Sequence, residues 1–84
     1  MRKQSLTTNQ IETLKADMRF TVQYNHNSET GAEAISARIK QIDSFLRMAF
    51  DLHIIDDYKQ VSNIMQQVTG AGLQELDLQR TYNS

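Results

Sequence analysis

Apolar residues recur every three or four positions near the start of the chain, at Ile11, Leu14, Met18 and Val22. This spacing forms a stripe along one side of a helix. Just before it, Thr7 and Gln10 match a capping box, in which the two side chains satisfy free backbone amides at a helix start. We therefore predict a first helix over about residues 8–24.

Residues 19–24 also fit a strand, because polar and apolar side chains alternate there and several are β-branched or aromatic. In that alternative the helix stops near Met18 and a short strand follows. On a helix, Phe20 and Tyr24 instead form a second apolar stripe with Ala16, nearly opposite the first. The capping box and the four-membered stripe favour the helix.

The longest apolar stripe lies in the middle of the chain, at Ile35, Ile39, Ile42, Leu46 and Ala49. A polar turn precedes it, and Thr30 with Glu33 resembles a second capping box. Asp43 and Arg47, four residues apart, form an ion pair typical of an exposed helix face. These features predict a second helix over about residues 30–52, with His53 continuing the stripe at its end.

A third stripe consists of Tyr58, Val61, Met65 and Val68, with Ile64 beside them. Asp57 with Gln60 resembles another capping box, and Thr69-Gly70 is typical of a helix end, where glycine accepts a left-handed conformation. We predict a third helix over about residues 57–69. Residues 71–84 then form a tail, and all three glycines lie outside helix interiors.

Together these patterns predict an all-α protein, a small three-helix bundle with a C-terminal appendage, in one domain over residues 1–84. The bundle has more apolar surface than three core stripes need. The surplus consists of Phe20, Tyr24, Phe45, Met48 and Leu52. Small domains often bury such a surplus by associating, so we expect a homodimer or a complex with another protein. In the alternative, the segment Leu73–Leu78 folds back and covers this surface within a monomer.

Composition narrows the function classes. Nine Lys and Arg against ten Asp and Glu give a formal net charge of −1, which offers no overall field for nucleic acid or an anionic membrane. The absence of cysteine excludes disulfides, thiol nucleophiles and zinc sites with sulfur ligands. The N-terminus lacks the apolar region of a secretory signal, and no apolar run is long enough to cross a bilayer. We expect a cytoplasmic protein that makes no membrane contact.

Residues with catalytic potential have simpler explanations. Asp56 and Asp57 are adjacent where a helix needs a cap, and His53 fits a helix end stabilised by the dipole. No glycine-rich loop follows a strand, and the serines lie in caps, on helix surfaces or at the terminus. We therefore expect no enzyme activity, no catalytic residues, no cofactor and no metal site.

The best functional hypothesis is a small, non-catalytic protein–protein interaction module that acts through an apolar helical face. An adaptor, an inhibitor or a regulator would fit, for example one carried by a phage or plasmid. Its partner is a second copy, another protein, or both, with Phe20, Tyr24, Phe45, Met48 and Leu52 as anchors, because aromatic residues and Met are enriched in interface cores.

A DNA-binding transcriptional regulator is the alternative, acting through the basic N-terminal segment. If residues 19–24 form a strand, Arg19, Thr21 and Gln23 point outward and can read base edges from a β-ribbon, with Lys15 nearby. Ribbon-helix-helix repressors bind DNA in this way, but the long helix predicted over 30–52 departs from their pattern.

Overall fold

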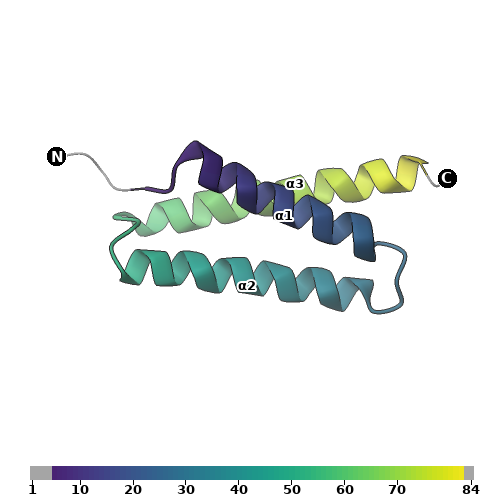
Figure 1. Cartoon of the computed structure of the whole chain (residues 1–84), viewed down its shortest axis with the longest axis horizontal. Helices are drawn as coiled ribbons and strands as arrows, with labels where there is room; N and C mark the ends of the chain where they lie inside the picture. Colours follow the sequence, from purple (N-terminus) through teal and green to yellow (C-terminus); the bar gives the residue numbers. More distant parts are fainter. Residues whose placement is uncertain (1–4, 83–84) are drawn as a thin grey trace.

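The computed structural model describes residues 5–82, which form three helices and no strand. They are α1 (Thr8–Asn25), α2 (Gly31–Asp51) and α3 (Tyr58–Tyr82). Successive helices run in opposite directions, and α1 crosses α3 while α2 lies along both (Figure 1). The described chain is therefore all-α, as predicted, with each helix in contact with the other two.

The start of α1 follows the predicted capping box. The Thr7 hydroxyl accepts a hydrogen bond from the Gln10 backbone N–H (3.1 Å), and Gln10 Oε1 accepts one from the Thr7 N–H (2.8 Å). The helix continues without interruption through residues 19–24. The predicted helix is confirmed, and the strand alternative is wrong, because Val22 belongs to the buried stripe of a helix that also includes Met18.

The core lies between the inner faces of the three helices. Met18 and Val22 from α1, Leu46 from α2 and Val68 from α3 are 0–2% exposed. Ile55, in the connection before α3, is also fully buried and packs into the same cluster. Partly buried residues surround this centre, namely Ile11, Leu14, Ile35, Ile39, Phe50, Met65 and Leu76. The three predicted stripes therefore supply the core, except that Tyr58 at the start of the third stripe is 44% exposed.

The turn between α1 and α2 differs from its prediction in one detail. Thr30 makes no side-chain cap; its hydroxyl and its backbone N–H both hydrogen-bond Ser28 Oγ (3.2 Å each). Its ψ of 12° is far from the extended conformation that a capping residue needs. Gly31 begins α2 directly against α1, since a Cβ there would overlap the carbonyl oxygen of Asn25. Close approach of two backbones, and not a cap, fixes this turn.

The end of α2 is a Schellman motif. The N–H of Ile54 donates to the Ala49 carbonyl (2.8 Å), and the N–H of His53 donates to the Phe50 carbonyl (3.0 Å). His53 occupies the left-handed position, with φ of 61°, which glycine usually takes. The prediction that His53 continues the buried stripe is wrong, because the chain has already left the helix and the side chain is exposed.

The start of α3 is capped by Asp57, whose Oδ1 accepts the backbone N–H of Lys59 (3.0 Å). The predicted return contact from Gln60 is not formed, because Gln60 Oε1 is buried without a hydrogen-bond partner. Asp57 is therefore an N-cap, but the complete capping box predicted for this helix is wrong.

The largest difference concerns the C-terminal third of the chain. Helix α3 does not end at Thr69 but continues to Tyr82, so residues 71–82 are no separate tail, and residues 83–84 lie outside the described part. Gly70 and Gly72 are inside the helix, and neither has a positive φ. A Cβ at Gly72 would lie 3.0 Å from Met18 Cγ. Gly72 therefore serves close packing of α3 on α1.

Candidate interaction surface

Five of the exposed apolar side chains lie on the outer sides of α1 and α2. Phe20 and Tyr24 are 58% and 70% exposed; Phe45, Met48 and Leu52 are 50%, 61% and 63% exposed. We call these five residues the outer face. Such an exposed group matters because soluble monomers rarely leave large apolar side chains clustered in water.

At one end of the outer face, Phe20 and Tyr24 stack on each other with ring centroids 4.5 Å apart. They border a hollow of about 420 Å³ between α1 and α2. On the α2 side the hollow is lined by Ala34, Ala37, Arg38 and Gln41. The two alanines leave the space that larger side chains would fill, so the hollow forms where α1 packs beside them.

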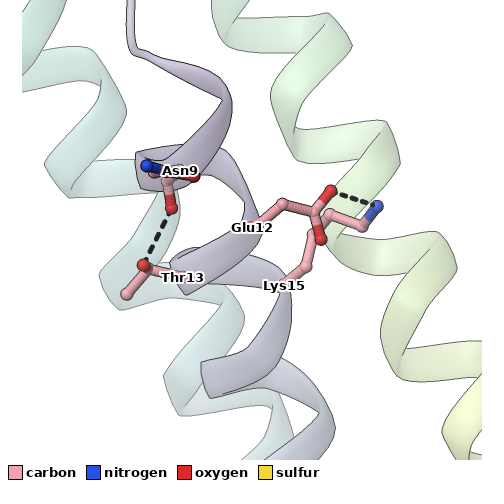
Figure 2. A network of polar contacts seen from close by, with 4 residues as sticks. All are labelled: Asn9, Glu12, Thr13 and Lys15. Atoms are coloured by element: carbon pink, nitrogen blue, oxygen red, sulfur yellow. Dashed lines mark hydrogen bonds and ion pairs between the residues drawn. The ribbon is translucent and has the colours of Figure 1, made fainter.

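The other end of the outer face consists of Phe45, Met48 and Leu52, each at least half exposed. Phe45 borders a second hollow of about 200 Å³, whose α1 side includes Thr13 and Leu14. Thr13 points toward α2, and its hydroxyl donates to the Asn9 carbonyl (2.8 Å), as Figure 2 shows. Met48 follows Phe45 by three residues on the same face of α2, and Leu52, the C-cap residue just after the helix, follows four residues later.

Charged side chains of α2 form ion pairs, one beside the outer face and one on the side toward α3. Arg38 reaches from α2 to Asp17 on α1 (3.6 Å) beside the hollow at Phe20. Arg47 Nε donates to Asp43 Oδ2 (2.9 Å), and this hydrogen bond raises the pKa of the Arg47 guanidinium above its usual value. The predicted Asp43–Arg47 pair is therefore formed, on the side of α2 toward Tyr58, whose ring centroid lies 6.0 Å from Arg47 Cζ.

The C-terminal segment does not cover this surface. Leu73 and Leu78 lie within the straight helix α3 and are themselves 59% and 51% exposed. Phe20, Phe45 and Met48 remain at least half exposed in the described chain. The alternative in which Leu73–Leu78 folds back over them is therefore wrong, since continuation of α3 past Gly70 carries that segment away along the helix axis.

The four residues of the DNA-binding alternative do not form one outward row. Thr21 is 9% exposed, and its hydroxyl donates to the Asp17 carbonyl (2.9 Å). Lys15 pairs with Glu12 (3.2 Å), on the side of α1 toward α3 (Figure 2). Gln23 donates from Nε2 to the buried carboxylate of Glu75, and Arg19 is half-buried. The β-ribbon that would have aligned Arg19, Thr21 and Gln23 is absent from the described residues.

Residues considered for chemistry are dispersed. Between residues 5 and 82, no three His, Asp or Glu side chains are placed to hold a metal ion together. His53 is exposed at the end of α2, and Asp57 is engaged at the start of α3. None of the described helices has the length and apolar character needed to cross a membrane.

Two features of the surface were missed from the sequence. The alanine-lined hollow needs the position of α1 beside Ala34 and Ala37, which no spacing along the chain reveals. A smaller apolar hollow of about 70 Å³ lies among the three helices and is lined by Val22, Ile39 and Leu73, among others. Ala71 and Leu76 continue the side of the helix that Met65 and Val68 occupy, and this periodicity could have indicated that α3 extends far enough to form the hollow.

Comparisons with protein-family models, with curated proteins and with solved structures found no match for this chain.

Proposed function

We propose that this chain is a small, non-catalytic protein–protein interaction module whose three-helix bundle binds a protein partner through the outer face. The observation that carries the proposal is the exposure of three aromatic side chains, Phe20, Tyr24 and Phe45, at 50% or more. Buried aromatic anchors dominate binding energy in protein interfaces. Their position over hollows between two rigid helices gives a partner defined pockets to fill.

The free energy of burying the outer face also favours binding to a partner. Transferring a large apolar side chain out of water contributes about 1.5–3 kcal/mol, so five half-exposed side chains leave several kcal/mol unused in a protein of this size. The ion pair of Arg38 with Asp17 joins α2 to α1 beside the hollow at Phe20, so the charge that lines this hollow already has a partner.

The proposal is tested by recovering partners with a tagged chain from the cells that produce it. Phe20→Asp and Phe45→Asp each place a charge on the outer face at a site exposed enough to leave the core intact. Leu78→Asp is the matched control, since Leu78 is 51% exposed but lies on α3. Circular dichroism verifies that all variants keep their helices.

We expect proteins recovered by the wild type and by Leu78→Asp to be lost with Phe20→Asp and Phe45→Asp. The same proteins recovered in equal amounts by all four chains would overturn the proposal, because binding would then not use the outer face.

A further inference from the structure

Along α2, Phe45 and Met48 of the outer face continue a row of smaller residues. The row consists of Ala34, Ala37, Gln41, Phe45 and Met48, so the spacings are three, four, four and three residues. These spacings are the same when counted from either end, with Gln41 at the centre. The two alanines line a hollow, whereas Phe45 and Met48 protrude. One surface therefore holds both a set of projections and the recess that could receive them.

We propose that the partner on this surface is a second copy of the chain, packed with the two α2 helices antiparallel around a two-fold axis at Gln41. This inference rests on the proposed function. In that arrangement Phe45, four residues after Gln41, lies opposite Ala37 of the second copy, four residues before it. Met48, seven residues after Gln41, lies opposite Ala34, seven residues before it. Both large side chains of this row then meet an alanine.

A two-fold pair uses the same patch on both copies, so it requires a surface complementary to itself. The row on α2 meets this requirement with alanine at one end and Phe45 and Met48 at the other. Phe20 and Tyr24 extend the complementarity, since they border the hollow beside Ala37 and contact whatever enters it. Gln41 is uncharged, so the axis brings no like charges together.

The exposed area fits a dimer interface. If a whole aromatic side chain offers about 200 Å², the exposed fractions of Phe20, Tyr24 and Phe45 leave about 350 Å² in water. Met48 and Leu52 raise this to roughly 500 Å². A standard interface buries about 800 Å² on each partner, of which about 65% is apolar in homodimers. The outer face supplies about that apolar share.

The charges agree with burial of the hollow against another copy. Arg38 is the charged side chain among the described residues that line it, and its guanidinium already pairs with Asp17 at 3.6 Å. Both groups are about half exposed, and the two opposite charges compensate each other when Phe45 of the second copy enters the hollow beside them. Association therefore strands no unpaired charge.

Cysteine crosslinking tests the axis directly, because the chain contains no cysteine of its own. In Gln41→Cys the two thiols face each other across the proposed axis. Two α2 helices that touch there bring the two Cα atoms of this position within the roughly 4.4–6.8 Å that a disulfide spans. We expect mild oxidation of the purified protein to convert most of it to a covalent dimer. Gln74→Cys is the matched control, an exposed glutamine position on α3, and we expect it to crosslink several-fold more slowly.

A residue exchange tests the register. Phe45→Ala alone leaves alanine facing alanine, and Ala37→Phe alone sets phenylalanine against phenylalanine, so each should weaken dimerisation by at least tenfold in sedimentation equilibrium. The double variant restores one large and one small side chain at each contact. We expect it to recover most of the lost affinity.

Three results would overturn the inference. A wild type that stays monomeric from about 1 μM to 1 mM would show that the chain does not form a dimer at these concentrations. Equal crosslinking of Gln41→Cys and Gln74→Cys places the axis elsewhere, and additive losses in the double variant refute the register. A monomeric wild type whose partners are still lost with Phe45→Asp would leave the proposed function standing with a different protein on the outer face. If the wild type were monomeric and Phe45→Asp retained those partners, both the dimer and the proposed function would be refuted.

Discussion

The three glycines predict three different responses to the same substitution. Each Gly→Ala change adds one methyl group, so its effect on stability depends only on local space and backbone conformation. At Gly70 the added methyl would have no heavy atom within 4 Å, whereas at Gly72 it would lie 3.0 Å from Met18 Cγ. At Gly31 it would overlap the Asn25 carbonyl oxygen.

The magnitudes follow from these contacts. Gly70→Ala should raise the free energy of unfolding by about 1 kcal/mol, the difference in helix propensity between alanine and glycine. Gly72→Ala should change it by less than about 0.5 kcal/mol, since the same gain is offset by displacing a flexible Met side chain. Gly31→Ala should lower it by about 2–4 kcal/mol, because the overlap pushes α1 and α2 apart and disrupts the turn hydrogen bonds of Ser28.

Urea unfolding followed by circular dichroism measures all three variants at one fixed protein concentration, since association would add a concentration-dependent contribution. In a chain of this size, 1 kcal/mol corresponds to about 4–8 °C in Tm, which a thermal scan resolves. Wild-type stability in Gly31→Ala would refute the described turn. A clear loss in Gly70→Ala would refute the placement of Gly70 in an open helix interior.

Three further substitutions test separate parts of the fold by the same unfolding assay. His53→Gly should stabilise the protein by about 1 kcal/mol, because glycine relieves the left-handed φ of 61°; destabilisation would argue against the Schellman motif. Thr7→Ala should cost about 1 kcal/mol by removing the cap of α1, and no change would mean that the box contributes nothing. Leu46→Ala should cost about 2–5 kcal/mol, since Leu46 is fully buried; a cost below about 1 kcal/mol would place it outside the core.

Much of the fold was predictable because the stripes are local. Met18, Val22 and Leu46 are buried where a helical period places them, and the capping box of Thr7 forms as two residues three apart should. These features depend only on residues within one or two helical turns of each other, so they can be predicted from the order of residues along the chain. The exposure of Phe45 likewise follows from its position beside a stripe that already fills the core.

The errors arose where tertiary contact overrides a local signal. Gly70 is typical of a helix end, but Val68 and Ala71 dock on the core and hold α3 together across it. Helix propensity costs only about 1 kcal/mol at such a glycine, which burial of the flanking residues outweighs. The hollow beside Ala37 escaped prediction for a related reason, because it depends on how α1 and α2 pack.

Photo-crosslinking in the cells that make the protein tests most directly whether the outer face is a contact surface. A photoreactive phenylalanine analogue replaces Phe45 in one chain and Leu78 in another, so that both probes are about equally exposed. We predict discrete crosslinked species from position 45, whether the partner is a second copy or another protein, and only weak background from position 78. Equal background at both positions, with the chain folded and expressed, would contradict the account.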